Sequence, residues 1–258
     1  MSKIGLIQGD CLGKMKDIPD KSIDLTVTSP PYDNLRTYNG NNDQWGAHVW
    51  KKVLSELFRV TKQGGVVVWV VGDATIKGSE TGTSFKQALW AIDCGFNLHD
   101  TMIYQKRNYL PRNHKRYEQS FEYMFVMVKG KIATFNPIRE PVLYPRDRTL
   151  RFREKDGHKV SRQKPKTDKI KANIFAYKTG GGHVSTDKIS HQHPAIFPEQ
   201  LAHDHIVSWS NYGDLVYDPF MGSGTTAKMA MLNKRKYIGS EISKEYFEIA
   251  EKRINENI

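Results

Sequence analysis

The sequence has little of what marks a secreted, disulfide-bonded or membrane-spanning protein. Only two cysteines, Cys11 and Cys94, occur in 258 residues, too few for a disulfide framework or a zinc site built from cysteines. No apolar run approaches the roughly 20 residues that a membrane-spanning helix needs. The opening residues, MSKIGLIQGD, lack the apolar core of a signal peptide. We therefore expect a cytoplasmic protein with reduced thiols and no membrane partner.

The histidines offer no metal site. His191 and His193 form one close pair, and His203 and His205 form another. Side chains two residues apart diverge on a helix, and neither pair accompanies the H-x-E and P-C-x-x-C motifs of zinc base deaminases. We expect no bound metal.

The positive charge of the chain is concentrated in one segment. The formal net charge is +11. Residues 106–178 contain 20 Lys and Arg against 7 Asp and Glu, whereas the rest of the chain contains 19 against 21. Aromatic residues (Tyr109, Tyr117, Tyr144 and Phe152) interleave with these charges. A solvated basic face is one interpretation, but the pattern favours a nucleic acid as partner.

Strand and helix patterns alternate along most of the chain, which predicts a three-layer α/β domain. Continuous β-branched runs such as GGVVVWVVGD are typical of strands buried on both faces of a parallel sheet. Strands are predicted at 4–8, 23–28, 64–73, 96–106, 120–130, 214–219 and 236–242. Helices are predicted at 11–18, 45–61, 84–95, 198–210, 225–233 and 244–254.

The pattern fails between residues 135 and 194. This stretch is rich in Lys, Arg and Pro, contains KTGGGHVS, and has no sustained period. A structureless loop of that length is unusual inside a compact domain. We therefore predict an inserted functional segment at 135–194 between an α/β half at 1–134 and a second half at 195–258.

The stretch LVYDPFMGSGTTAKMAM predicts a strand, an acidic residue, a glycine turn and a helix. It is similar to the first turn of dinucleotide-binding folds, where glycines permit a tight bend close to a ligand. It is not a P-loop, because Thr225 and Thr226 stand where Lys-Ser/Thr would be. Glu241 follows Asp218 by 23 residues, a distance typical of the acid that binds the ribose hydroxyls of a nucleoside cofactor.

A second motif, TSPPY, follows the predicted strand at 23–28. Together with DPFMGSGTT it resembles the S-adenosylmethionine-dependent DNA amino-methyltransferases of the beta order, in which the catalytic motif comes first and the cofactor motif last. The resemblance covers almost the whole chain. It implies a Rossmann-like methyltransferase fold with a mostly parallel sheet flanked by helices, and a target-recognition insertion at 135–194. S-adenosylmethionine and double-stranded DNA are the implied cofactor and partner.

The resemblance also assigns residues to the cofactor. Asp10 is expected near the adenine amino group, and the segment HQHPAIFPEQL near the methionine end. The residues expected around the cofactor are Asp10, Cys11, His193, Pro194, Asp218, Pro219, Phe220, Gly222, Ser223, Gly224, Thr225 and Glu241. By its residue type alone, Cys11 reads as a small buried apolar residue.

The catalytic motif is predicted to be Ser29, Pro30, Pro31 and Tyr32. An exocyclic amine is a poor nucleophile because its lone pair is delocalised into the ring. The Ser29 hydroxyl and the Pro30 carbonyl can accept its N–H hydrogens and aim the lone pair at the methyl group. The prolines fix the backbone, and Tyr32 offers a face on which an extruded base can stack. Tyr32→Phe is then expected to be tolerated much better than Tyr32→Ala.

The sequence YLPRNHKRYEQSFEYMFV resembles the family's region near the target base, without indicating which residue contacts it. Phosphate contacts are the safer expectation for basic residues of the 106–178 segment. The predicted DNA-binding residues are Arg112, Lys115, Arg116, Arg146, Arg148, Arg151 and Arg153.

Several alternatives remain open. Within the resembling family Ser-Pro-Pro-Tyr is more typical of cytosine-N4 enzymes and Asp-Pro-Pro-Tyr of adenine-N6 enzymes, so cytosine N4 is favoured over adenine N6. A DNA-binding protein without catalysis, or an RNA or protein methyltransferase, is a more distant alternative. The resemblance fits the modification half of a restriction system with a cognate endonuclease, an orphan enzyme or a phage enzyme, and either a monomer or a homodimer. The side chains that would read the recognition sequence fall in the segment without periodicity.

Overall fold

The protein is described by a computed structural model. It describes residues 5–32, 45–109, 115–144, 166–179, 184, 185, 187 and 198–256, together with the backbone of strands at 148–154 and 157–163. Two compact units arise: one comprises residues 1–136 and 173–258, and the other Pro137–Ala172. Each is described separately below.

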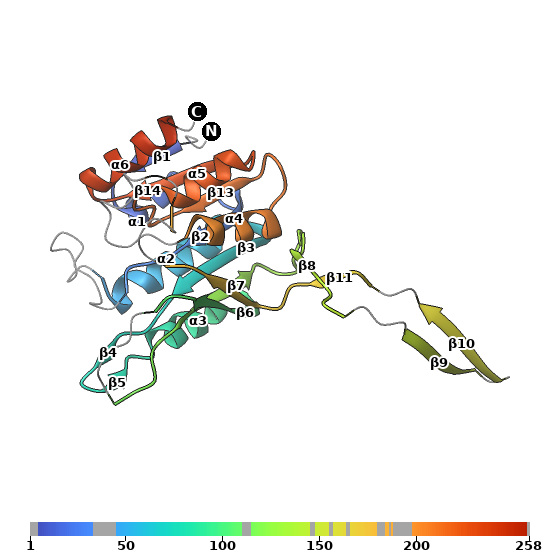
Figure 1. The fold of residues 1–258 in the computed structure, drawn as a ribbon. Coiled ribbons are helices and arrows are strands. Elements are labelled where there is room, and N and C mark those ends of the chain that lie inside the picture. The colour runs from blue at the N-terminus through green and yellow to red at the C-terminus, as the bar shows by residue number, and fades with distance from the viewer. Residues whose placement is uncertain are drawn as a thin grey trace. The chain divides into compact units, whose positions relative to one another are not determined.

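The large unit contains an eight-stranded mixed sheet in the order β1-β14-β13-β2-β3-β7-β6-β12 (Figure 1). Every neighbouring pair is parallel except β3–β7 and β7–β6. The eight strands are β1 (Gly5–Gln8), β2 (Ile23–Thr28), β3 (Thr61–Val71), β6 (Asn97–Lys106), β7 (Phe121–Val128), β12 (Ile174–Tyr177), β13 (Leu215–Asp218) and β14 (Lys236–Glu241). The predicted α/β fold with a mostly parallel sheet is confirmed.

Helices flank this sheet in two series of contacting neighbours, α1-α2-α3 and α4-α5-α6. The helices among the described residues are α1 (Cys11–Met15), α2 (Ala47–Val60), α3 (Thr83–Asp93), α4 (Glu199–Trp209), α5 (Thr225–Leu232) and α6 (Lys244–Asn255). A short hairpin of β4 (Thr75–Ile76) and β5 (Ser79–Glu80) precedes α3. Within the described residues, no helix combines the length and apolarity needed to cross a lipid bilayer.

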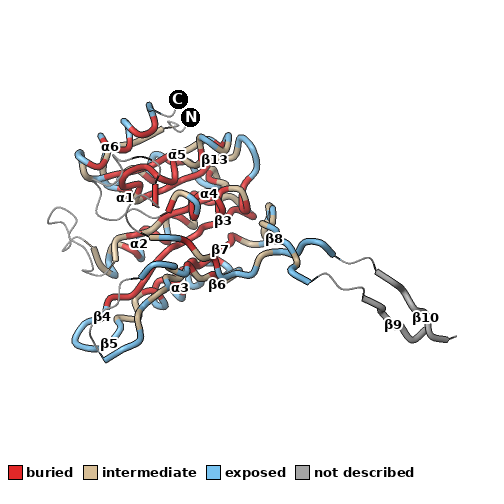
Figure 2. The backbone as a smooth tube through the Cα atoms, viewed as in Figure 1, coloured by how far each residue is buried: buried red, intermediate tan, exposed pale blue. Residues whose placement is uncertain are grey.

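The core lies along the central strands (Figure 2). Residues 66–71 of β3 are at most 2% exposed, as expected for a β-branched run covered on both faces. The apolar positions of α2 (Val53, Leu54, Leu57 and Val60) are fully buried, because they recur at helical spacing on one face.

The strand directions determine where the site lies. In a parallel sheet the carboxyl ends of β2, β3, β13 and β14 meet at one edge, where open α/β sheets bind ligands. Because β7 is antiparallel to β3 and β6, the amino end of β7 lies at the same edge as the carboxyl ends of β3 and β6. Residues from distant parts of the chain therefore meet there.

The small unit lies within the predicted insertion and consists of two antiparallel ladders. β8 (Arg139–Pro141) pairs with β11 (Asp168–Ile170), and β9 (Arg148–Glu154) pairs with β10 (Gly157–Gln163). Ion pairs join β8 to β11: Arg139 to Asp168 at 2.8 Å and Lys169 to Glu140 at 3.1 Å. Strand β12, also inside 135–194, belongs to the large sheet. A role of the small unit in target recognition stays a prediction.

Candidate active site

The glycine turn after β13 is built for close backbone packing. Gly222 and Gly224 have φ of 52° and 81°, a left-handed conformation that glycine adopts readily. A Cβ at Gly224 would lie 2.9 Å from the Cβ of Ala250 in α6. Glycine at 224 therefore lets α5 begin directly beside α6.

Asp218, the last residue of β13, is a buried carboxylate with one unused oxygen. Its Oδ1 accepts hydrogen bonds from Thr28 Oγ1 at 2.6 Å and from the Phe220 amide at 3.0 Å. Its Oδ2 has no hydrogen-bond partner among the described residues. Burial raises the pKa of Asp218 to about 6, although the hydroxyls of Thr28 and Thr226 and the Phe220 amide oppose the rise. A cationic ligand group facing Oδ2 would relieve this cost.

Glu241, the last residue of β14, fastens the glycine turn. Its Oε2 accepts from the Gly222 amide at 2.8 Å and its Oε1 accepts from the Ser243 amide at 2.9 Å. Burial raises the pKa of Glu241, and these backbone hydrogen bonds oppose the rise. Each oxygen retains a second lone pair, so the carboxylate can also accept from ligand hydroxyls.

Asp10 and Cys11 follow β1 on the same edge of the sheet. The Gly9 amide donates to the Glu241 carbonyl at 2.8 Å, which brings the end of β1 beside the end of β14. The exposed Asp10 side chain caps α1 by accepting from the Gly13 amide at 2.9 Å. Cys11 is 6% exposed and belongs to the apolar core, and burial raises the pKa of its thiol to about 12. Such a thiol is an inert packing group.

The remaining predicted cofactor residues lie in or next to the glycine turn, except for two. Phe220 packs edge-on against Trp45, with ring centroids 5.3 Å apart, and Pro219 precedes it. His193 and Pro194 lie outside the described residues.

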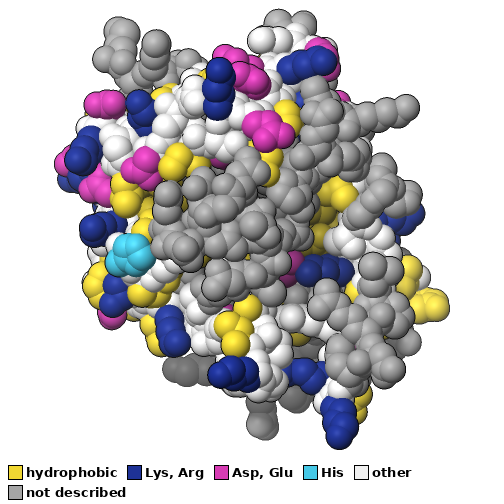
Figure 3. Space-filling view, turned by 90° about the vertical axis from the view of Figure 1, so that its left-hand side faces the viewer, with side chains coloured by type: hydrophobic (Ala, Val, Ile, Leu, Met, Phe, Trp, Pro, Cys, Tyr) yellow, Lys and Arg dark blue, Asp and Glu magenta, His cyan; other side chains and the backbone are white. Residues whose placement is uncertain are grey.

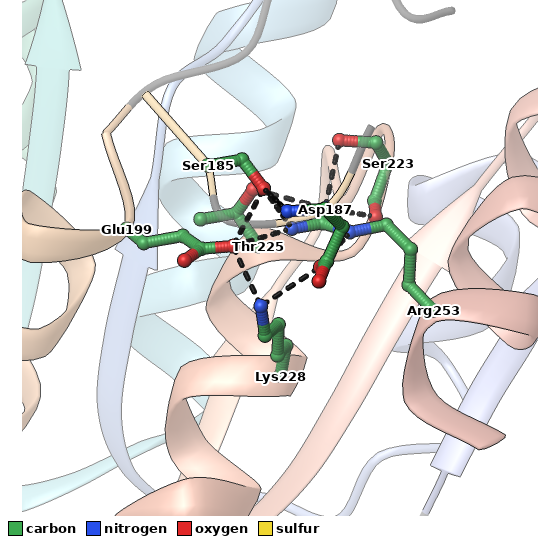
Figure 4. A network of polar contacts seen from close by, with 7 residues as sticks. All are labelled: Ser185, Asp187, Glu199, Ser223, Thr225, Lys228 and Arg253. Atoms are coloured by element: carbon green, nitrogen blue, oxygen red, sulfur yellow. Dashed lines mark hydrogen bonds and ion pairs between the residues drawn. The ribbon is translucent and has the colours of Figure 1, made fainter. Parts of the chain in front are cut away.

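A buried polar network packs against the glycine turn that follows β13 (Figure 4). Arg253 of α6 is fully buried and donates to the Ser223 carbonyl at 2.5 Å and to Thr225 Oγ1 at 3.3 Å. The same guanidinium pairs with Asp187 at 3.0 Å and Glu199 at 2.9 Å.

Lys228 of α5 completes this network, with its ammonium 2.8 Å from both Asp187 and Glu199. Ser185 joins through hydrogen bonds to Glu199 at 2.7 Å and to Arg253 at 3.2 Å. Two buried cations thus face two carboxylates, so the network compensates its own charge. It ties residues 185 and 187 to the helices that carry the glycine turn.

The Ser-Pro-Pro-Tyr turn lies at the carboxyl end of β2, the strand next to β13. Ser29 Oγ donates to Tyr32 Oη at 3.2 Å, and Tyr32 Oη donates to Glu122 Oε2 at 2.7 Å. Glu122 Oε1 lies 2.6 Å from Lys106 Nζ. Pro30 is buried, whereas Ser29, Pro31 and Tyr32 are partly exposed.

A cleft of about 390 Å³ opens beside this turn. Gly72 and Glu122 line it, and a Cβ at Gly72 would lie 3.6 Å from Tyr32 Cε2 and 3.4 Å from Glu122 Cγ. The Tyr32 ring and the Glu122 stem therefore pack beside the end of β3. The other lining residues are Asp73, Glu80, Arg116, Tyr117, Glu118, Gln119, Phe121 and Tyr123.

The predicted DNA-binding residues divide into three groups. Lys115 and Arg116 are exposed, and Arg116 also donates to the Gly78 carbonyl at 3.0 Å and pairs with Glu80 at 3.4 Å. In the view of Figure 3, Lys and Arg predominate in the lower half, and Asp and Glu lie among them in the upper half. Arg148, Arg151 and Arg153 are placed on the backbone of β9. Arg112 and Arg146 lie outside the described residues.

The histidine of α4 is a packing group. His205 is 1% exposed, accepts at Nδ1 from Trp209 Nε1 at 3.1 Å, and contacts Met124 Sδ at 3.1 Å. Burial lowers the pKa of His205 to about 3. In the part of the chain that the structure describes, His, Cys, Asp and Glu do not gather in groups of three that would hold a metal ion.

Sequence reasoning missed three residues that the site brings together. Thr28 precedes the Ser-Pro-Pro-Tyr turn and donates a hydrogen bond to Asp218. Glu122 accepts a hydrogen bond from Tyr32, and Lys106 forms an ion pair with Glu122. A signal for Glu122 was present, because a carboxylate interrupts the otherwise apolar strand FEYMFVMV. Nothing in the sequence indicates that this carboxylate faces Tyr32.

The geometry brings an unsatisfied buried carboxylate, a glycine turn and a hydroxyl-bearing turn to one edge of the sheet. Comparison with known proteins finds relatives that match nearly the whole chain. The family described as DNA methylase, N6_N4_Mtase, matches residues 23–252. The orphan methyltransferase M.BamHII of Bacillus amyloliquefaciens is 54% identical over 250 residues, which cover 94% of this chain and 92% of that protein.

Two further similarities extend over nearly the whole chain. The DNA adenine methyltransferase YhdJ of Escherichia coli K12 is 28% identical over 97% of this chain and 82% of its own length. The crystal structure of the M1.HpyAVI–SAM complex shares the fold with a TM-score of 0.65 and 24% identity, covering 97% of this chain and 99% of that one.

Proposed function

The chain belongs to the N6/N4 DNA methylase family, and from this premise we propose that it transfers the methyl group of S-adenosylmethionine to cytosine N4 in duplex DNA. The observation that carries the proposal is the adjacency of two motifs. Thr28 Oγ1, one residue before Ser29, donates to Asp218 Oδ1 at 2.6 Å. A cofactor held by the glycine turn and an amine held by Ser29 would therefore be neighbours.

The cofactor fits the residues at the glycine turn. The unused Oδ2 of Asp218 would accept from the ammonium of the methionine moiety, and the free lone pairs of Glu241 from the ribose hydroxyls. Asp10 would lie near the adenine amino group, with its carboxylate already orienting α1. S-adenosylmethionine, when bound, supplies an electrophilic methyl group on a sulfonium.

The Ser-Pro-Pro-Tyr turn would activate the amine. Ser29 Oγ and the Pro30 carbonyl would accept hydrogen bonds from its two N–H groups, which directs the nitrogen lone pair toward the methyl group. Because Pro30 and Pro31 have no N–H, they add no competing donor at this turn. The Tyr32 ring would pack against the base, which has to leave the duplex to reach the site.

Cytosine N4 is favoured by Ser29, because Ser-Pro-Pro-Tyr resembles the motif of cytosine-N4 enzymes. Adenine N6 is the second candidate, supported by the 28% identity to a protein described as a DNA adenine methyltransferase. Both reactions need the same acceptors, so the side chains described around the cleft do not separate them.

The basic residues of 106–178 supply the charge for contact with DNA phosphates. We assign target recognition to the predicted insertion 135–194, within which the small unit contains two hairpin-like ladders. The 54% identical relative is described as an orphan methyltransferase, which supports an enzyme that acts without a cognate endonuclease.

Nucleoside mass spectrometry of plasmid DNA tests the proposal. The chain is expressed in a host without its own DNA methylation, beside the empty vector and the Ser29→Ala variant. We expect N4-methylcytosine from the parent and much less from the variant. N6-methyladenine alone would support the second candidate, and absence of both modified bases would contradict the proposed function.

A competition assay separates the more distant alternatives. Purified protein and labelled S-adenosylmethionine are offered duplex DNA, single-stranded DNA, RNA and a protein extract in one reaction series. Label should enter duplex DNA first. Preferential labelling of RNA or protein would identify another substrate class, whereas DNA binding without any transfer would indicate a non-catalytic protein.

A further inference from the structure

We propose that Glu122 is a positioning residue that acts through Tyr32 to make Ser29 an obligate hydrogen-bond acceptor. The inference rests on the proposed function, because it concerns how Ser29 meets the reacting amine. A serine hydroxyl can either donate or accept, yet only accepting from the amine aims its lone pair at the methyl group. Some feature must therefore fix the direction of the Ser29 hydrogen.

The fixed direction follows from a chain of three contacts. Glu122 pairs with the Lys106 ammonium through Oε1 at 2.6 Å, and a carboxylate in an ion pair only accepts hydrogen bonds. Across the 2.7 Å contact the single hydroxyl hydrogen of Tyr32 must therefore point at Glu122 Oε2. Toward Ser29, whose Oγ lies 3.2 Å away, the Tyr32 oxygen can then act only as an acceptor. The hydrogen of Ser29 is thereby directed at Tyr32, and its lone pairs remain for the amine.

Lys106 anchors the far end of this relay. Its ammonium lies 2.6 Å from Glu122 Oε1 and carries only donors. The ion pair is mostly buried, with side chains 25% and 14% exposed. It comes from β6 and β7, whose antiparallel pairing is part of the rigid sheet. The relay therefore connects the rotatable Ser29 hydroxyl to two paired strands, β6 and β7.

The arrangement makes a specific prediction for Glu122→Gln, which changes charge but hardly changes shape. The amide nitrogen cannot face Lys106, because two donors would meet. The amide oxygen turns to Lys106 and the NH2 group turns to Tyr32, whose oxygen must accept. The Tyr32 hydrogen is then no longer held by Glu122 and can point at Ser29, so the direction of the Ser29 hydrogen is no longer fixed. The variant should fold yet slow transfer.

The experiment measures single-turnover methyl transfer at saturating S-adenosylmethionine on a duplex that the parent methylates. Glu122→Gln should lower the rate by about tenfold or more, the effect of one misdirected hydrogen bond in the transition state. Cofactor affinity by calorimetry should stay close to the parent, and the variant should remain folded at the assay temperature although the ion pair with Lys106 is lost. Glu248→Gln is the matched control, since Glu248 also pairs with a lysine, Lys244, but on the exposed face of α6, where Glu248 is 61% exposed.

Two combinations separate positioning from general damage. In Lys106→Met/Glu122→Gln the amide is free to turn its oxygen to Tyr32, so the rate should recover relative to Glu122→Gln alone. Tyr32→Phe removes the middle of the relay, and adding Glu122→Gln to it should cause no further loss, because coupled residues are not additive.

Opposite results would overturn the inference. An unchanged rate in Glu122→Gln, or additive losses in the two combinations, would show that Glu122 does not act through Tyr32 while leaving the proposed function intact. A parent protein that transfers no methyl group to DNA would overturn the proposed function and this inference together.

Discussion

Asp218→Asn should weaken cofactor binding without destabilising the protein. The substitution keeps an oxygen that can still accept from Thr28 and from the Phe220 amide, which both bond Oδ1. It replaces Oδ2, which has no partner among the described residues, with an NH2 group. Only the proposed contact to the cofactor ammonium loses its acceptor.

The expected loss of affinity follows from one charge-assisted hydrogen bond. Such a bond contributes about 1.5–3 kcal/mol, which corresponds to a cofactor affinity roughly 10- to 150-fold weaker. In the parent, affinity should also fall as the pH drops below about 6, because Asp218 then becomes protonated. The Asn variant should bind with the same weak affinity across that range.

The stability of the cofactor-free protein should depend on pH in the opposite direction to the cofactor affinity. Burial raises the pKa of Asp218 from 3.8 to about 6, so between these values the folded protein holds a proton that the unfolded chain has lost. The free energy of unfolding therefore falls as pH rises through this window, by roughly 3 kcal/mol in total. Asparagine does not titrate, so the variant does not lose this stability as the pH rises. Its unpaired side-chain amide, however, costs about 1–3 kcal/mol of stability. At pH 7 the variant should be equally stable or slightly more stable.

Calorimetry with S-adenosylmethionine and urea unfolding at pH 4, 5, 6 and 7 measure the two effects. Asp204→Asn is the matched control, because Asp204 is buried and both of its oxygens accept hydrogen bonds, from Tyr177 and Gln200. It should lose stability and keep its cofactor affinity. Parent-like affinity of Asp218→Asn, or its destabilisation at pH 7 to the extent of the control, would refute the assignment.

Other predictions probe the turn, the supporting network and the DNA surface. Glu199→Gln should lower the free energy of unfolding by about 3–5 kcal/mol, because buried Lys228 and Arg253 lose a compensating charge; urea titration measures this, and a loss below 1 kcal/mol would contradict it. Tyr32→Ala should slow single-turnover transfer more than Tyr32→Phe, since it also loses a stacking surface worth roughly 1–3 kcal/mol; equal rates would exclude stacking. Neutralising four arginines together should flatten the salt dependence of DNA binding, by about 0.9 per lost phosphate contact, and an unchanged slope would move the DNA surface elsewhere. These arginines are Arg146, Arg148, Arg151 and Arg153.

Much of the fold was predictable because its signals are local. The continuous run in β3, the helical spacing in α2 and the glycine turn before α5 each depend on residues close in sequence. The thirteen strands and helices predicted outside 135–194 all occur, with bounds shifted by a few residues. Strand β12 was missed because four residues, IFAY, follow a basic stretch without any period, and only pairing with β6 makes them a strand.

In the candidate site, only the residues that belong to local sequence motifs were predictable. Asp218 and Ser29 were found because their neighbours form recognisable turns. The tolerance expected for Tyr32→Phe overlooked the hydroxyl, which bonds both Ser29 and Glu122; we now expect a slower enzyme. Glu122 lies 90 residues from Tyr32, and no local pattern reports such a contact. Arg253 is similar, since on a helix rich in charges it reads as a surface residue.

The two motifs are held together by a single strand pairing. β13 and β2 pair in parallel, with Val216 opposite Leu25 and Tyr217 opposite Thr26. This register carries Asp218 and Thr28 to the same edge, where their hydrogen bond joins the end of one strand to the end of the other. A slip of one residue would turn every side chain of β2 to the opposite face. In the proposed function, the distance between cofactor and amine would therefore depend on the register of these two buried strands.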